Sequence, residues 1–157
     1  MAVYVMEAFI ECGSDKTAVE AIKQHFQGLM VRTRKGDSTH CVVWVYKDQE
    51  ENWCCIAWPH GCGLGTPAGV RPELTDAEAV KDLQDALLAH LRKAPAFRFA
   101  LVDGEVDDVR SFSELNEWDF QNLHGLIVSN ELWEQFKMPA NFEYFSPNCM
   151  WLPRKLI

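Results

Sequence analysis

The stretch HCVVWVYKDQEENWCCIAW, residues 40–58, is the clearest structural signal in the chain. It holds two apolar runs, 40–46 and 53–58, that are rich in β-branched and aromatic residues and are separated by the polar loop 47–52. Two such runs joined by a short polar loop are typical of antiparallel strands. The stretch therefore predicts a β-hairpin, from which the rest of the fold can be built outward.

The register of this hairpin determines which cysteines share a face of the sheet. Pairing of Tyr46 with Trp53 would place Cys41 and Cys54 on one face and Cys55 on the other, because successive side chains of a strand alternate. The metal site that this register allows would use Cys41, Cys54, His60 and Cys62. We expect small core residues instead, because free cysteine is among the most buried residue types. No cofactor is therefore expected.

The segments around the hairpin alternate between strand and helix patterns. Residues 3–11 read as a strand, and apolar residues recur at helical spacing over 15–29 and again over 75–93. A further strand is predicted at 97–102. The order βαββαβ predicts an α+β fold with a ferredoxin-like antiparallel sheet and two helices on one face, formed by residues 1–103.

The C-terminal residues 104–157 form an extension that is rich in aromatic residues. It shows a short strand at 124–129, a helix that Ser129 can cap, and two further short strands near the end of the chain. This aromatic content predicts packing on the sheet or against a partner, in one domain that spans 1–157.

Charge is unevenly distributed along the chain, whose net charge is −8. Residues 103–119 contain seven acids and one base, a balance of −6. A polyanion would be repelled, which argues against nucleic acid or an anionic membrane as the ligand and favours a basic protein partner. The residues predicted to bind that partner are Asp103, Glu105, Asp107, Asp108, Glu117, Trp118, Asp119 and Phe120.

The N-terminus reads as a strand and lacks the basic region of a signal peptide. We therefore expect a cytoplasmic protein whose six cysteines are reduced thiols. Cys12 precedes a predicted helix, a position that can lower the pKa of a thiol. The chain contains no recognised catalytic signature, and no catalytic residue is predicted.

Part of the C-terminal third has a likeness to a known group of proteins. HGLIVSNELWEQF, residues 124–136, followed by FEYFSP, residues 142–147, is similar to the end of some bacterial immunity proteins of polymorphic toxin systems. The chain also resembles the compact, acidic proteins encoded by integron gene cassettes. The resemblance implies a strand, a serine-capped helix and a second strand, and it implies no particular binding residue.

These observations lead to two expectations about function. The first is a non-enzymatic binding protein of the immunity type, which neutralises a basic protein partner through an acidic face. The alternative is a small-molecule binding module or an enzyme with a pocket under the loop Gly61–Gly69, lined by Trp44, Trp53, Trp58 and His60. A homo-oligomer formed through the aromatic C-terminal segment is compatible with either function.

Overall fold

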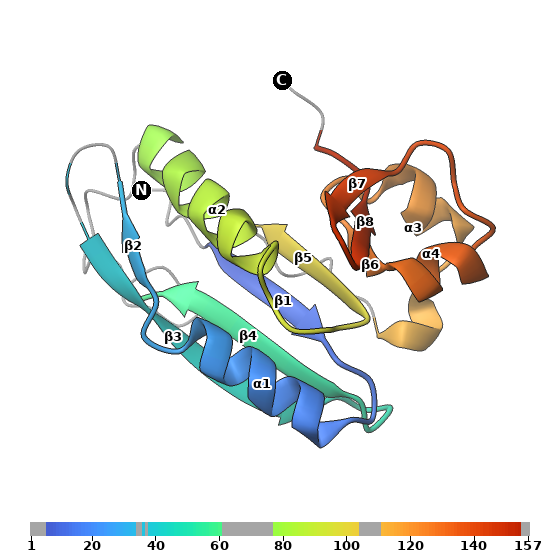
Figure 1. Cartoon of the computed structure of the whole chain (residues 1–157), viewed down its shortest axis with the longest axis horizontal. Coiled ribbons are helices and arrows are strands. Elements are labelled where there is room, and N and C mark those ends of the chain that lie inside the picture. Colours follow the sequence, from blue (N-terminus) through green and yellow to red (C-terminus); the bar gives the residue numbers. More distant parts are fainter. Residues whose placement is uncertain (1–5, 34–35, 37, 61–76, 104–110, 155–157) are drawn as a thin grey trace.

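The computed structural model describes residues 6–33, 36, 38–60, 77–103 and 111–154. These residues form a mixed α+β structure with an eight-stranded antiparallel sheet and four α-helices (Figure 1). The strand order is β2-β3-β4-β1-β5-β6-β8-β7. In chain order the elements are β1 (Glu7–Glu11), α1 (Lys16–Phe26), β2 (Met30–Arg32), β3 (Ser38–Lys47), β4 (Trp53–Pro59), α2 (Ala77–Leu91), β5 (Phe99–Asp103), the 3₁₀ turn η3 (Phe112–Glu114), α3 (Glu117–Asn122), β6 (Ile127–Ser129), α4 (Asn130–Gln135), β7 (Glu143–Ser146) and β8 (Cys149–Trp151).

The sheet is larger than the four-stranded sheet that the sequence predicts. The short β2 pairs with the beginning of β3, and the strands of the C-terminal extension continue the same sheet beyond β5. The junction is made by β5 and β6, where Phe99 pairs with Val128 and Ala100 with Ile127. The extension is therefore joined to the rest of the sheet by backbone hydrogen bonds as well as by side-chain packing.

The β3–β4 hairpin forms as predicted, but its register differs by one residue. Lys47 pairs with Trp53, and Tyr46 pairs with Cys54. The loop is closed by Asp48, whose Oδ1 accepts hydrogen bonds from the backbone of Glu50 at 2.8 Å and Asn52 at 2.9 Å. The side chain adds to the backbone hydrogen bonds of the turn, from Asp48 N–H to the carbonyl of Asn52 and from Glu51 N–H to the carbonyl of Asp48. The shift reverses the predicted face of Cys54, because a one-residue slip exchanges the two faces of a strand.

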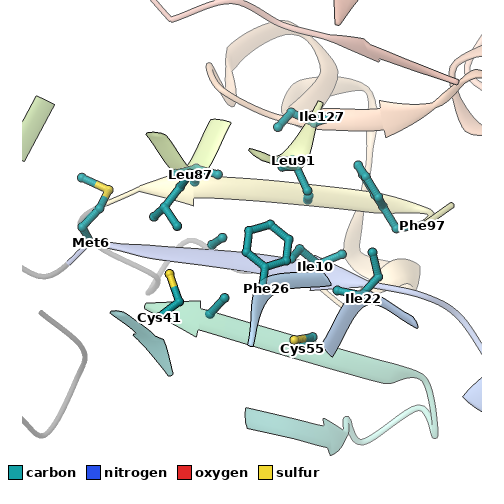
Figure 2. Packing of buried hydrophobic residues seen from close by; sticks show 14 of the residues in the cluster. Met6, Ile10, Ile22, Phe26, Cys41, Cys55, Leu87, Leu91, Phe97 and Ile127 are labelled. Carbon is teal, nitrogen blue, oxygen red and sulfur yellow. The ribbon is translucent and has the colours of Figure 1, made fainter. Parts of the chain in front are cut away.

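Two clusters of buried side chains cover the two faces of the sheet. On one face, α1 and α2 pack their apolar residues against β1, β4 and β5, and Ile10, Phe26 and Leu87 lie in this cluster (Figure 2). On the opposite face, Phe9 and Phe99 of the sheet pack against the C-terminal segment. The C-terminal segment thus covers part of the face that the two long helices leave open. None of the described helices is long and apolar enough to cross a membrane.

The C-terminal ends of α1 and α2 meet through a pair of histidines. The Nε2 of His25 lies 2.8 Å from the carbonyl oxygen of His90, and the Nε2 of His90 lies 2.5 Å from that of His25. The rings stack with centroids 3.8 Å apart. With Nε2 protonated, each ring donates to a carbonyl at the end of the other helix, where backbone acceptors lack partners within their own helix. The pair therefore caps both helices at once.

This histidine pair is expected to make stability depend on pH. Burial lowers the pKa of His90 below its ordinary value of 6.5, and the neighbouring His25 and Lys93 act in the same direction, while the hydrogen bond to His25 opposes them. As the pH falls through about 6.5, the unfolded chain binds a proton that the folded chain does not, so the folded state loses stability. We expect the melting temperature to fall between about pH 7.5 and pH 5.5.

The variant His90→Gln should show a smaller fall over the same pH range, because the titrating group is gone. Gln24→Ala, at an exposed and non-titrating position of α1, provides the matched control and should keep the wild-type pH dependence. Differential scanning calorimetry in a series of buffers measures both. An equal pH dependence in the wild type and His90→Gln would contradict the assignment to this pair.

Candidate binding groove beside α3

Only part of the predicted acidic face lies within the described residues. Asp103 is the last residue of β5. The other acids of its neighbourhood, which lie outside the described residues, are Glu105, Asp107 and Asp108. The remaining four predicted residues are consecutive in α3, from Glu117 to Phe120.

Glu117 and Trp118 are exposed, as a partner-binding surface requires, and 61% of Trp118 is accessible to solvent. The next two residues are buried and not exposed as predicted, although Phe120 lines the groove described below. Asp119 is 1% exposed and Phe120 is 2% exposed. The cause is the amphipathic character of this short helix, which turns one side toward the sheet and the other toward solvent.

Asp119 has a structural role at the beginning of α3. Its backbone N–H donates to Oδ1 of Asn116 at 3.1 Å, and its Oδ2 accepts from the backbone N–H of Asn116 at 3.2 Å. This reciprocal arrangement is a capping box, which satisfies two donors that the first turn of a helix leaves unpaired. The buried carboxylate thus fixes where α3 begins.

Phe120 anchors α3 in an aromatic stack. Its ring lies 3.9 Å from that of Phe136 and 5.4 Å from that of Phe142, measured between centroids. Phe142 is buried, whereas Phe136 is half-buried. One side of this stack is therefore left at the protein surface, next to the exposed residues of α3.

A groove of about 460 Å³ opens over this stack. Its size falls in the range of sites that bind small ligands or side chains, roughly 300–1,000 Å³. Within the described part of the chain, Glu117 makes no ion pair, and no lysine or arginine lines the groove. The lining consists of Glu117, Phe120, Gln121, Phe136, Pro139, Ala140 and Asn141.

The wall opposite α3 is a turn that several hydrogen bonds hold in place. Lys137 and Met138 adopt left-handed backbone conformations with φ of 64° and 51°, which cost energy for residues other than glycine. The indole N–H of Trp133 donates to the carbonyl of Pro139, and the Asn141 amide donates to the carbonyl of Phe120, each at 3.2 Å. These contacts tie the turn to α3 and α4, so the groove is already formed in the unbound protein.

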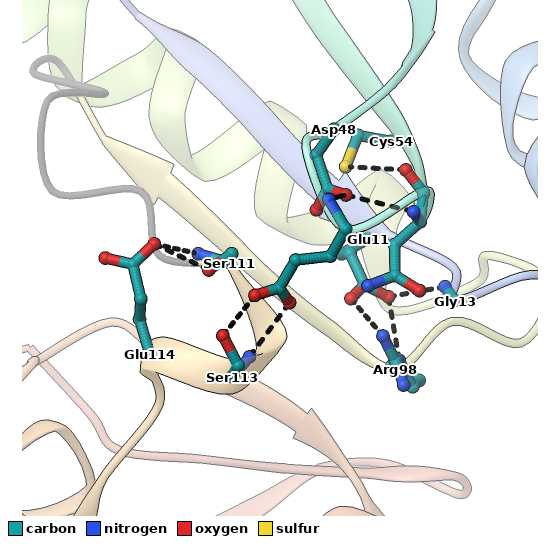
Figure 3. Close-up of polar contacts among 10 residues, drawn as sticks. Glu11, Gly13, Asp48, Cys54, Arg98, Ser111, Ser113 and Glu114 are labelled. Carbon is teal, nitrogen blue, oxygen red and sulfur yellow. Dashed lines mark hydrogen bonds and ion pairs between the residues drawn. The ribbon is translucent and has the colours of Figure 1, made fainter.

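A polar junction between β1, β5 and η3 positions this region on the sheet (Figure 3). Glu11 is fully buried, and the Nε of Arg98 donates to its Oε1 at 2.8 Å. A second guanidinium nitrogen bonds the other carboxylate oxygen, and the backbone N–H of Gly13 also donates to Glu11. The guanidinium carbon lies 3.7 Å from the centroid of the Phe112 ring in η3. The pair therefore connects the sheet to the turn that precedes α3.

A second contact fixes η3 from the side of the hairpin. The Glu50 carboxylate in the β3–β4 loop accepts a hydrogen bond from the backbone N–H of Ser113 at 3.1 Å and another from the Ser113 hydroxyl. These hydrogen bonds lower the pKa of Glu50. Sequence reasoning did not identify the ion pair of Glu11 and Arg98, because its residues are 87 positions apart and only the strand register brings them together.

The structure also contains a second cavity, of about 450 Å³, beside the start of α1. Its lining includes two carboxylates, from Asp15 and Glu131, but also the guanidinium of Arg98. Asp15 is already occupied as the N-cap of α1, because its Oδ1 accepts from the backbone of Thr17 at 2.9 Å. This cavity thus has mixed charge, unlike the groove beside α3.

The four residues predicted to line the alternative pocket under Gly61–Gly69 do not all lie on one face of the sheet. The loop itself lies outside the described residues. Trp44 and Trp58 lie on the face opposite α1 and α2. Trp58 pairs with Val42, and Val42 shares a face of β3 with Trp44. His60 continues this face and stacks with His40 at 5.2 Å between centroids. Trp53 packs on the other face, beneath the ammonium group of Lys16.

The cysteines behave as core residues in the described structure. Cys41 and Cys55 lie on the face of α1, and Cys54 lies on the opposite face, so Cys41 and Cys54 do not face one site. Burial raises the pKa of the Cys12 thiol from 9.0 to about 12, and Cys55 and Glu11 add to this shift, which is opposite to the lowering that a position before a helix can cause. Among the described residues, no group of three or more ligands could hold a metal ion.

Comparisons with protein-family models, with curated proteins and with solved structures find no match to this chain. The kind of ligand that fits the groove beside α3 is therefore inferred from the side chains that line it. It offers one carboxylate, two carboxamides and the surface of a phenyl ring.

Proposed function

We propose that this chain is a non-enzymatic binding protein that neutralises a basic protein partner, in the manner of the immunity proteins to which residues 124–147 are similar. The observation that carries the proposal is that two neighbouring residues of α3, Glu117 and Trp118, are both exposed. Glu117 has no ion pair among the described residues and lines the groove, and the next residue, Trp118, is 61% exposed. The net charge of −8 favours the same class of partner.

The two residues would contribute to binding in different ways. A negative surface raises the rate at which a positive partner associates, and this contribution falls as salt screens the charges. Large aromatic side chains contribute mainly to the lifetime of the complex, because they bury apolar area at its centre. We therefore expect Glu117 to act mostly on the association rate and Trp118 mostly on the dissociation rate.

Substitution of these residues tests the proposal. The partner is first identified by native mass spectrometry of the protein purified from its own host, and binding is then measured by surface plasmon resonance. Glu117→Lys should slow association on the order of tenfold at low salt and weaken its salt dependence. Trp118→Ala should mainly accelerate dissociation, with a loss of about 2 kcal/mol of binding free energy.

Glu143→Lys provides the matched control, because it reverses an exposed charge on β7 outside the groove and should change binding much less. The partner should itself carry a net positive charge. A partner whose association and dissociation rates are unchanged by both Glu117→Lys and Trp118→Ala would contradict the proposed surface.

We also propose that β1, β3, β4 and β5, with α1 and α2, constitute a ferredoxin-like unit inside the larger sheet. Their spatial order, β3-β4-β1-β5, is the order of a split βαβ layer, and every neighbouring pair is antiparallel. The packing of both helices on one face supports the same interpretation. In this arrangement β2, β6, β7 and β8 are additions at the two sides.

A further inference from the structure

We infer that the groove beside α3 receives an arginine side chain of the basic partner. This inference rests on the proposed function and specifies the chemical group that the same surface recognises. The groove combines a carboxylate with a half-buried phenyl ring and has no cation of its own in the described structure. These are the complementary features of a flat, positively charged side chain.

The ring of Phe136 provides the apolar part of the site. It stacks on Phe120 with an angle of 13° between the rings and remains half-buried. A guanidinium group packs well against an aromatic surface, because it is planar, is weakly hydrated and is attracted by the electrons of the ring. The structure already uses this contact elsewhere, where the guanidinium carbon of Arg98 lies 3.7 Å from the Phe112 ring centroid and that of Arg92 lies 4.2 Å from the Phe145 ring centroid.

The polar side chains of the groove match the donors of a guanidinium group. Glu117 offers two carboxylate oxygens, and the side chains of Gln121 and Asn141 each contain an amide oxygen. The Asn141 side chain is held in place because its nitrogen donates to the carbonyl of Phe120. Arginine has five N–H donors in one plane, whereas lysine has a single compact ammonium group. Several acceptors around a flat surface therefore favour arginine over lysine.

The second cavity shows why charge alone does not define this site. It has a similar volume and two carboxylates, but Arg98 already occupies part of its lining. Of its two carboxylates, that of Asp15 is already engaged as the N-cap of α1 and is therefore less available to an additional guanidinium group. Of these two cavities, the groove beside α3 is the one expected to accept arginine.

Nuclear magnetic resonance with a small probe tests the inference in the intact chain. Nα-acetyl-arginine amide should shift the resonances of residues that line the groove, with a dissociation constant on the order of millimolar. The uncharged isostere Nα-acetyl-citrulline amide should bind at least about fivefold more weakly, and so should the arginine probe to Glu117→Gln. Glu131→Gln, in the second cavity, should leave the affinity unchanged.

Equal shifts with the arginine and citrulline probes, or shifts confined to the second cavity, would overturn the inference. Its failure can be distinguished from failure of the proposed function. If Glu117→Lys weakens partner binding but the arginine probe does not bind the groove, only the inference is wrong. If the probe binds but neither α3 substitution affects the partner, the inference about the groove holds and the proposed function is wrong.

Discussion

Arg98→Met is expected to lower the free energy of unfolding by about 3 kcal/mol at pH 7, the low end of the range for breaking a buried ion pair. The substitution leaves the carboxylate of Glu11, which is fully buried, with the backbone N–H of Gly13 as its remaining donor among the contacts of the polar junction. The low end applies because the Arg98 side chain is itself 33% exposed. Urea denaturation followed by circular dichroism measures the loss.

Two comparisons isolate the effect of charge. The double variant Glu11→Gln with Arg98→Met should be more stable than Arg98→Met alone, because no charge is then left buried. Lys81→Met, which breaks the exposed pair with Asp85, should cost less than about 0.5 kcal/mol.

A double variant no more stable than Arg98→Met alone would mean that the buried charge is not the cause. The loss of packing between Arg98 and Phe112 would then account for it.

Phe120→Ala is expected to cost about 4 kcal/mol, within the range measured for removal of a buried phenylalanine. The ring is 2% exposed and stacks between Phe136 and Phe142, so its removal leaves a cavity and breaks both ring contacts. The melting temperature should fall by more than 10 °C, since roughly 1 kcal/mol corresponds to a few degrees in a chain of this size.

Its neighbour Trp118 provides the control, because this larger side chain is mostly exposed. Trp118→Ala should change stability by less than about 0.5 kcal/mol while it weakens partner binding. The two adjacent aromatic residues are thus expected to have separate effects, one on folding and the other on recognition. A loss of less than about 1 kcal/mol in Phe120→Ala would contradict the role of Phe120 as the anchor of α3.

The sequence predicted those features of the fold that depend on local pattern. The β3–β4 hairpin and the helices α1 and α2 were identified because apolar periodicity is a property of neighbouring residues. The hairpin register was wrong by one residue, because Asp48 closes the loop with its side chain. The larger sheet was not predicted either, because the pairing of β5 with β6 depends on contacts between distant segments.

The binding groove was predictable only in part, for similar reasons. Glu117 and Trp118 were correctly expected at the surface. Asp119 was misassigned, although its spacing from Asn116 is that of a capping box and could have indicated its role. Phe136 was not identified, since nothing in the sequence places its ring on Phe120. The ring is followed by a left-handed turn at Lys137 and Met138. Glycine usually marks such a turn in a sequence, but neither residue is glycine.

The outermost strands of the described sheet have a further consequence for recognition. At one side lies β2, which is three residues long, and at the other lies β7, whose register is irregular between Tyr144 and Ser146. Long, regular outer strands invite a foreign strand to join by main-chain hydrogen bonds, and short or bulged ones discourage it. However, β2 covers only Ser38–His40 of the ten-residue β3, so no described strand pairs with the outer edge of the rest of β3. A foreign strand could join there, whereas at the β7 side a partner must be selected by side-chain chemistry.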